Sequence, residues 1–317
     1  MWKYIDKEKC NEYLLSLNLI DNKLIDKERL KKLYSISNRI EDNYKVFKIK
    51  KRNGKYRTIH EPNSTLKYIQ RQILTNILND MKISKYAKAY HKGIGLKDNA
   101  IEHTNKEMIL KLDLENFFDN ISFIDVYNTC FPIEYFPKSI GMLLTYLVTY
   151  EDHLTQGSPT SSYISNLVMR DFDEELGNYC HNIDVSYTRY SDDMTFSGKF
   201  NPTDIIKKVN QLLKKTNLSL NKDKIHVINK NNKQIVTGIV VNQKLSIDIN
   251  YRKKIRQEIY YIKKYGLNSH LKHINYPSSK ETYLNNLYGR ILYVLQIDNN
   301  NQEFKEYKKY IKELKGK

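Results

Sequence analysis

Two short apolar strands that carry aspartates constrain this chain more than any other feature of its sequence. Residues 108–114 form an apolar run that contains Asp113. Residues 185–190 are rich in β-branched and aromatic residues and lead directly into Asp192 and Asp193. Another strand-like run follows this acidic pair, which is therefore predicted to lie in a hairpin turn. Adjacent carboxylates repel each other unless a cation shares them, although such pairs also occur by chance on surface loops.

Asp113 is the natural third member of an acidic site with this pair. Successive side chains of a strand point to opposite faces, so at most one of Asp192 and Asp193 can face a carboxylate from a neighbouring strand. Carboxylates that converge from two strands can hold two Mg²⁺ ions about 3.5–4 Å apart. That arrangement stabilises the attacking and leaving oxygens in phosphoryl transfer. The sequence therefore indicates a phosphoryl-transfer site at the ends of these strands.

The charge balance of the chain points to a polyanionic partner. Its 317 residues include 53 Lys and Arg against 36 Asp and Glu, a formal net charge of +17. A positive field of this kind concentrates phosphates, and nucleic acid is the first candidate. Abundant Lys, Asn, Ile and Tyr also fit an AT-rich genome, so the 26 tyrosines carry little functional information. The hydrophobic content of 40% argues against intrinsic disorder.

Several features argue against a membrane or an oxidising compartment. The longest apolar runs, such as residues 142–150, are about half of the roughly 20 residues that a spanning helix needs. The first residues lack the apolar core of a signal peptide, so we expect a cytoplasmic protein with no membrane partner. Cys10, Cys130 and Cys180 are far apart and lack metal-ligand spacing, and we expect them to be buried and unpaired.

The hydrophobic pattern predicts an α+β fold without long linkers or internal repeats. Residues 44–60 alternate apolar and basic residues around Asn53 and Gly54, which indicates a β-hairpin with one cationic face. Asp98 is predicted to cap a helix that begins at Asn99. Other helices are predicted at about residues 1–42, 64–79, 159–176, 251–265, 280–296 and 302–315, and other strands at 235–241 and 245–249.

Three motifs in order resemble the palm of reverse transcriptases. Residues 190–193, Tyr-Ser-Asp-Asp, resemble the Tyr-x-Asp-Asp box of that family. Residues 113–118, Asp-Leu-Glu-Asn-Phe-Phe, resemble its first palm motif, with an aromatic residue five positions after the aspartate. Residues 156–161, Gln-Gly-Ser-Pro-Thr-Ser, followed by Ser165 and Asn166, resemble the motif between them. A single box is a weak signal, but three in order, each on the expected strand or helix, indicate the family.

Within this family the chain resembles the bacterial retron type. Residues 99–103, Asn-Ala-Ile-Glu-His, match its Asn-Ala-x-x-His element, and residues 236–238 match its Val-Thr-Gly element. The basic hairpin also looks like the fingers region of the family, and the resemblance covers roughly residues 44–298. Ser162 stands where the family usually has proline. We expect this change to loosen a helix start without removing a catalytic group.

The resemblance implies a right-hand polymerase with fingers, a palm of antiparallel sheet plus helices, and a helical thumb. The implied boundaries are an N-terminal helical segment at 1–43, fingers at 44–107 with part of 126–155 interleaved, a palm at 108–242 and a thumb at 243–317.

The resemblance also implies roles for residues of the acidic site. Asp113 and Asp192 would be ligands of two Mg²⁺ ions, with the Leu114 carbonyl as a further ligand and Asp193 close but less directly bound. Phe118 would lie under the sugar of the incoming dNTP and exclude a 2′-hydroxyl, or else be an ordinary core aromatic.

Further residues are implied to bind the nucleotide. Gln156 and Gly157 would shape the nucleotide and template pocket, with a plain helix-initiating turn as the alternative. Arg57 would clamp the triphosphate, because a guanidinium can engage phosphate oxygens bidentately. Lys224 would protonate pyrophosphate. For both cations the alternative is a solvated surface charge.

The retron-like elements and the thumb are assigned more general roles. Asn99 and His103 would share one helix face as a hydrogen-bonded packing pair, or else contact structured RNA. The basic helix in the C-terminal third would follow the backbone of an A-form duplex, or else be a solvated face. The residues assigned in these two regions are Asn99, His103, Val236, Thr237, Gly238, Arg252, Lys253, Arg256 and Lys263.

The resemblance implies an RNA-directed DNA polymerase that copies a dedicated structured non-coding RNA. Synthesis would be primed from the 2′-hydroxyl of an internal guanosine and give a branched RNA–DNA molecule (msDNA). Such systems act in anti-phage defence with a separate effector protein. The alternatives are a reverse transcriptase of another bacterial lineage, or a nucleic-acid-bound scaffold that restrains a toxic effector. The RNA, the effector, its trigger and the oligomeric state stay open at this stage.

Overall fold

The computed structural model describes residues 2, 5–50, 54 and 56–316. The chain divides into two compact units. Unit 1 comprises residues 1–93, 110–195 and 200–226, and unit 2 comprises residues 94–109, 196–199 and 227–317. The boundary between them passes through strands β3 (Met108–Asp113) and β5 (Asp193–Gly198).

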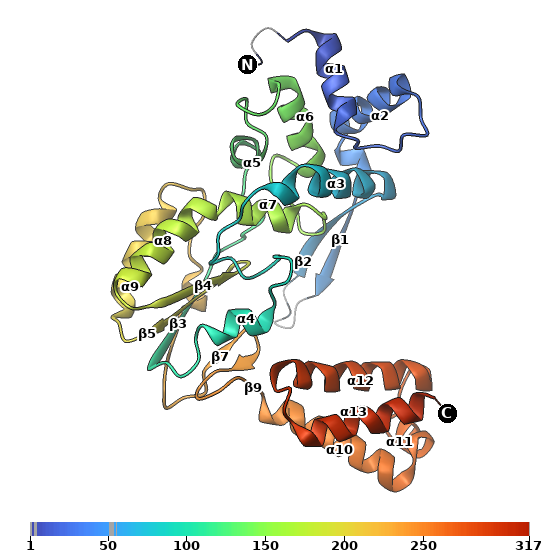
Figure 1. The fold of residues 1–317 in the computed structure, drawn as a ribbon, viewed down its shortest axis with the longest axis vertical. Coiled ribbons are helices and arrows are strands. Elements are labelled where there is room, and N and C mark those ends of the chain that lie inside the picture. Colours follow the sequence, from blue (N-terminus) through green and yellow to red (C-terminus); the bar gives the residue numbers. More distant parts are fainter. Residues whose placement is uncertain (1, 3–4, 51–53, 55, 317) are drawn as a thin grey trace. The chain divides into compact units, whose positions relative to one another are not determined.

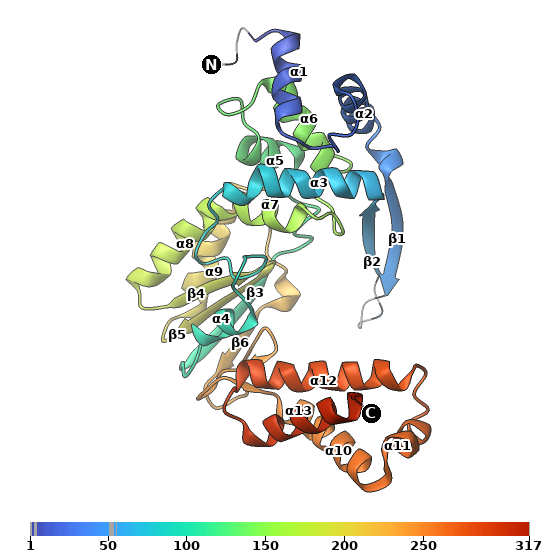
Figure 2. The ribbon, with the colours of Figure 1, turned by 45° about the vertical axis from the view of Figure 1, so that its right-hand side comes forward.

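The first part of unit 1 is a group of helices from which a β-hairpin extends (Figure 2). Strand β1 (Tyr44–Lys50) pairs antiparallel with β2 (Tyr56–Pro62), and Ile49 lies opposite Arg57. This confirms the predicted hairpin, although Asn53 of its turn lies outside the described residues. The helices of this part are α1 (Lys7–Ser16), α2 (Asp26–Asn38), α3 (Ser64–Asn76), α5 (Phe123–Cys130) and α6 (Lys138–Val148), with short 3₁₀ turns at Glu41–Asn43 and Leu78–Asp80.

A four-stranded sheet carries the acidic strands in the order β4, β5, β3, β6. Strand β3 is buried because Ile109, Leu110 and Leu112 are apolar on both of its faces. Helix α8 packs against β4, and α9 packs against α8 (Figure 1). The bounds are β4 Ser186–Tyr190, β6 His226–Asn229, α7 Ser161–Val168, α8 Arg170–Asn182 and α9 Pro202–Leu213, with a 3₁₀ turn at Lys222–Lys224.

The prediction of one helix over residues 159–176 is wrong, because α7 ends at Val168 and α8 begins at Arg170. Met169 between them has a ψ of 0°. A regular α-helix has a ψ of about −42°, so the helix is interrupted at this residue. Helix α7 begins at Ser161, so Ser162 lies in its first turn. The Ser162 carbonyl accepts a hydrogen bond from Ser165 Oγ at 2.8 Å. A helix therefore starts here without the family's usual proline.

Unit 2 combines a small sheet with a helical bundle. Strands β7 (Ile235–Val236), β8 (Ile239–Val240) and β9 (Ser246–Ile247) form an antiparallel sheet in that order. Ile255, Ile259 and Ile262 form the buried stripe of the first long helix. The helices are α10 (Ile249–Tyr265), α11 (Leu267–His273), α12 (Lys280–Ile297) and α13 (Gln302–Lys315). Helices α12 and α13 lie side by side in Figures 1 and 2.

Two sequence predictions within unit 2 are corrected by its turns. The expected strand 235–241 is broken by Thr237 and Gly238, whose φ values of 46° and 86° form a two-residue hairpin turn. Helix α4 (Leu96–Ile101) begins three residues before Asn99, with Gly95 at its N-cap. Asp98 does not cap it from outside. Instead its carboxylate, in the first turn, accepts a hydrogen bond from the Gly95 N–H at 2.8 Å.

The cysteine prediction is confirmed, because Cys10, Cys130 and Cys180 are all buried free thiols. Within the described ranges, the structure has no helix both long and apolar enough to cross a membrane.

Candidate active site

The turn between β4 and β5 brings the acidic residues together. Ser191 adopts φ 63°, a left-handed conformation that is uncommon for serine and frequent at functional sites. The Leu114 N–H, directly after β3, donates to the Asp192 carbonyl at 3.0 Å. Because Asp113 precedes Leu114, this bond fixes the backbone of one predicted metal ligand beside that of the other.

The carboxylates of the three aspartates influence one another. Loss of hydration, together with the charges of Asp192 and Asp113, raises the pKa of Asp193 to about 6. Burial likewise raises the pKa of Asp192, with the charge of Asp113 as an added cause. The structure therefore brings Asp113, Asp192 and Asp193 together, as the strand pattern indicated. Their repulsion is the kind that a divalent cation relieves.

Lys224 supplies a positive charge to this cluster. Its Nζ donates to both carboxylate oxygens of Asp113 at 2.8 Å. Burial lowers the pKa of Lys224, but its hydrogen bond to Asp113 and the nearby negative charges raise the pKa more, so the net change is upward. The Asn221 N–H also donates to the Asp113 carbonyl at 2.8 Å. The segment that carries Lys224 thus holds Asp113 by both its backbone and its side chain.

The carboxylates of Asp113 and Asp192 fit Mg²⁺ ions whose remaining coordination positions are filled by water and substrate. Among the residues that the structure describes, no three His, Cys, Asp or Glu side chains are already arranged to hold a metal ion. Mg²⁺ in nucleotide sites takes one or two protein carboxylates and fills its octahedron with water and substrate phosphates. Asp113 and Asp192 provide that number of carboxylates. The ammonium group of Lys224 already places one positive charge against Asp113.

Residues 156–161 approach the β1–β2 hairpin so closely that position 157 must be glycine. Gly157 adopts φ +129°, and an added Cβ would lie 2.6 Å from the His60 carbonyl oxygen. The His60 N–H donates to the Gln156 carbonyl at 3.0 Å. Gln156 and Gly157 therefore lie directly against β2. Arg57, on the same strand, has an exposed side chain that can meet a phosphate, and its triphosphate role stays a prediction.

The two phenylalanines after β3 differ in exposure. Phe117 is buried, whereas Phe118 is half-buried, and their ring centroids lie 5.3 Å apart. A partly exposed ring at position 118 suits contact with a sugar better than a core role does. The proposed exclusion of a 2′-hydroxyl by Phe118 stays a prediction.

Comparison with known proteins now identifies the family. The model of the reverse transcriptase (RNA-dependent DNA polymerase) family matches residues 49–255. The retron Ec83 reverse transcriptase of Escherichia coli is 34% identical over 64% of this chain and 70% of its own length. The retron Ec86 reverse transcriptase of the same species is 29% identical over 73% of each chain. The retron Se72 enzyme of Salmonella heidelberg is 32% identical over 74% of this chain and 65% of its own.

The chain belongs to the bacterial retron reverse transcriptases. It is thus an RNA-directed DNA polymerase with the α+β, right-hand fold that the motifs predicted. Among solved structures, a telomerase from Candida albicans is similar with a TM-score of 0.46 and 10% identity, over 85% of this chain and 66% of that one. The proposed boundaries of fingers, palm and thumb stay a prediction.

The two retron-like elements of this reverse transcriptase meet inside unit 2. Asn99 Nδ2 donates to Thr237 Oγ1 at 3.3 Å, and Asn99 is buried. His103 lies in the turn after α4, not on its face, and its Nδ1 is 2.7 Å from Ser197 Oγ. His103 is also buried, and so is Val236. This burial favours packing over direct contact with RNA.

The basic helix α10, which was predicted to belong to a thumb, makes contacts within unit 2. Arg256 forms a two-pronged ion pair with Glu303 of α13, at 2.7 and 2.6 Å. Lys263 Nζ lies 5.6 and 5.1 Å from the ring centroids of Tyr307 and Tyr310. Lys253 is exposed, and Arg252 is half-buried. Of the four predicted backbone contacts, the structure thus leaves Lys253 and Lys263 exposed, and Lys263 lies against two tyrosine rings.

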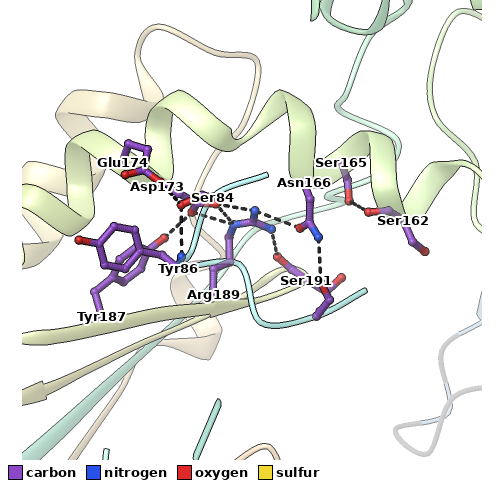
Figure 3. Close-up of polar contacts among 11 residues, drawn as sticks. Ser84, Tyr86, Ser162, Ser165, Asn166, Asp173, Glu174, Tyr187, Arg189 and Ser191 are labelled. Carbon is purple, nitrogen blue, oxygen red and sulfur yellow. Dashed lines mark hydrogen bonds and ion pairs between the residues drawn. The ribbon is translucent and has the colours of Figure 1, made fainter. Parts of the chain in front are cut away.

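Sequence reasoning missed a buried polar network beside the turn between β4 and β5 (Figure 3). Arg189 of β4 and Asp173 of α8 form an ion pair with both side chains fully buried. The available signal was Arg189 itself, the one charged residue in a strand whose other residues are uncharged. Such a residue is buried only when it is paired, but its partner cannot be read from the sequence.

Proposed function

We propose that this reverse transcriptase copies a structured non-coding RNA, primes synthesis from a 2′-hydroxyl of that RNA and makes a branched RNA–DNA molecule. The product would act in anti-phage defence together with a separate effector protein. Support comes from relatives that are retron reverse transcriptases at 29 to 34% identity. The net charge of +17 suits a nucleic-acid template.

The convergence of Asp113 and Asp192 through the Leu114 to Asp192 hydrogen bond is the observation that carries the catalytic part. Two Mg²⁺ ions bound there would stabilise the attacking and leaving oxygens during nucleotidyl transfer. Asp113 and Asp192 would hold them, with Asp193 beside them and the Leu114 carbonyl as a further ligand. The hydrogen bonds from Lys224 favour a role in holding the Asp113 carboxylate in place before nucleotide arrives.

The nucleotide pocket is proposed to form between β2 and the motif that precedes α7. Gly157 permits the backbone to approach His60 closely, and Arg57 on the same strand would bind the triphosphate. Phe118 would select deoxyribose. The part-buried hydrogen bond from Asn99 to Thr237 supports an internal structural role for the two retron-like elements.

The test compares nucleic acid that co-purifies with the wild type and with an Asp192→Asn, Asp193→Asn variant. We expect the wild type to carry a discrete species that leaves a short DNA after ribonuclease treatment on a denaturing gel. The variant should carry RNA alone, because its metal ligands are lost while its basic surface is intact. An Asp171→Asn, Asp204→Asn variant, changed at exposed carboxylates of α8 and α9, is the control.

DNA synthesis by the Asp192→Asn, Asp193→Asn variant would refute the site assignment. Heterogeneous RNA in every sample would refute self-priming on a dedicated RNA. In that case extension of an oligo(dT) primer on poly(rA) would show whether the chain works as an externally primed enzyme.

A further inference from the structure

Arg189 is the most completely satisfied buried cation of the described chain. Its Nε donates to Asp173 at 2.9 Å, and its Nη2 donates to the other Asp173 oxygen at 2.6 Å. Nη2 also reaches Asn166 Oδ1 at 3.2 Å. Nη1 donates to the Ser191 carbonyl at 2.9 Å. Figure 3 shows these bonds radiating from one guanidinium between α7, α8 and the turn after β4.

The hydrogen bond from Arg189 to Ser191 matters because Ser191 directly precedes Asp192. Its carbonyl belongs to the peptide unit that leads into Asp192, so the Arg189 bond fixes the orientation of that unit. The Ser191 hydroxyl accepts from Tyr90 Oη at 3.3 Å, which holds the same residue from another segment. Ser191 has a left-handed backbone, a conformation that persists only where its surroundings determine it.

Arg189 is itself held on both sides of its backbone. Its N–H donates to the Tyr86 carbonyl and its carbonyl accepts from the Lys88 N–H, both at 2.8 Å. Asn166, which orients the guanidinium, donates to the Ala89 carbonyl at 2.8 Å. The donor that reaches Ser191 is therefore fixed by segments that hydrogen-bond to each other. This rigidity is what the positioning of a reacting group requires.

Stability alone is a weak reason for this arrangement. A buried ion pair loses its hydration, and well-packed apolar residues of similar volume are often as stable or more stable. Burial lowers the pKa of Arg189, but the charge and hydrogen bonds of Asp173 raise it more, so the guanidinium stays charged. An apolar pair at these positions would have no donor for the Ser191 carbonyl. Only arginine has a planar guanidinium whose several N–H groups can donate to Asp173 and to the Ser191 carbonyl at the same time.

We propose that Arg189 is a positioning residue for DNA synthesis, which acts through Ser191 to set the placement of Asp192. Asp173 balances its charge and Asn166 orients it. Arg189 contacts neither nucleotide nor metal in this scheme. The inference rests on the proposed role of Asp192 as a metal ligand.

The first variant is Arg189→Lys. Lysine keeps the charge opposite Asp173, but its single nitrogen cannot reproduce the planar fork. We expect kcat for dTTP incorporation on poly(rA)/oligo(dT) to fall about 10- to 100-fold, because small misplacements of reacting groups have effects of this size. The KM for dTTP and the affinity for the RNA should change less than about twofold. Hydrogen–deuterium exchange should quicken in peptides that contain Ser191 and Leu114.

The second variant is the neutral pair Arg189→Met, Asp173→Asn. Asn at position 173 keeps an acceptor for the Tyr187 hydroxyl, which donates to Asp173 at 2.8 Å. We expect this protein to fold and bind RNA like the wild type but to show the same loss of kcat. The matched control is Arg170→Met, Asp171→Asn, which removes an exposed pair from the start of α8 and should keep the wild-type kcat.

The outcomes separate the positioning role from folding and from the site assignment. If the neutral pair folds and keeps kcat within about twofold of the wild type, the proposal is overturned. If neither variant folds, the network serves folding alone, and the proposal is likewise overturned. An active Asp192→Asn protein would instead refute the proposed function of Asp192 on which this inference rests.

Discussion

Two arginine–carboxylate pairs, one in each unit, have the same chemistry but different surroundings. Arg189 and Asp173 join β4 to α8 with both side chains 0% exposed. Arg256 and Glu303 join α10 to α13 with both side chains 36% exposed. The closest nitrogen–oxygen distance is 2.6 Å in each. Geometry alone would therefore rank the two pairs as equals.

Burial makes their roles different. Water can replace either partner of the exposed pair, and α10 and α13 belong to an apolar core that includes Ile255, Ile259 and Phe304. Water cannot replace either partner of the buried pair in this way, and its guanidinium also binds Asn166 of α7 and Ser191 in the turn between β4 and β5. Polar contacts therefore help to set the geometry around Asp192, whereas apolar contacts dominate the packing of the C-terminal helices.

Asp173→Ala should produce the largest change in stability. The substitution leaves Arg189 buried and uncompensated, and loss of one partner of a buried pair costs about 3–5 kcal/mol. The measurement is the free energy of unfolding in urea, followed by circular dichroism. Asp171→Ala, at an exposed position of the same helix, should change it by less than about 0.5 kcal/mol. Equal effects of the two substitutions would mean that burial does not distinguish these carboxylates.

Gly157→Ala tests whether close backbone packing around the candidate active site contributes to stability as the buried ion pair does. The new Cβ would meet the His60 carbonyl oxygen at 2.6 Å, and alanine is strained at φ +129°. We expect a loss of about 1–3 kcal/mol of stability and a raised KM for dNTP, because β2 must shift. Gly266→Ala is the control, since it has φ +81° but an added Cβ meets nothing within 4 Å. If both variants behave alike, strain and not contact with the hairpin explains the effect.

The difference between local patterns and tertiary contacts explains which parts of the fold could be predicted from the sequence. The hairpin at residues 44–60, the apolar strand before Asp113 and the stripe of Ile255, Ile259 and Ile262 follow from local periodicity. Each could be predicted because neighbours in sequence also share a face in space. The meeting of Asp113 with Asp192 could be predicted because carboxylates at the ends of two strands can share cations, and because the three motifs follow the order typical of reverse transcriptases.

The missed features depend on tertiary contacts or on turn geometry. Asp173 is one of many acidic residues on a helix, and only the fold places it against Arg189. Thr237 and Gly238 interrupt an apolar run, and their positive φ values turn an expected strand into a hairpin. Met169 ends a helix without proline or glycine. The nucleic-acid contact of Arg256 stays a prediction, but its ion pair with Glu303 could not be read from the sequence.

Glu303→Ala should have a small effect where Asp173→Ala has a large one. An ion pair as exposed as Arg256 with Glu303 contributes about 0–1 kcal/mol. The hydrogen bond from Arg256 holds the pKa of Glu303 below its usual 4.5, so this contribution is present at neutral pH. It should disappear as the pH falls through the lowered pKa of the folded state. Urea unfolding of both proteins at pH 7 and at acid pH measures it, and a loss above about 3 kcal/mol would contradict the comparison.

Lys253→Ala gives the smallest expected change and tests whether the exposed charges of α10 have a function that the paired ones lack. Lys253 is exposed, whereas Arg256 is neutralised by Glu303. If Lys253 contacts one phosphate, its loss should reduce the slope of log affinity against log salt concentration by about 0.7 to 0.9. Arg256→Ala should leave that slope unchanged, since its charge is already balanced inside the unit. Filter binding of the co-purified RNA between low and moderate salt measures both slopes. A larger change for Arg256 than for Lys253 would mean that RNA displaces Glu303, and the ion pair would then be a competitor for phosphate instead of a fixed part of the helical core.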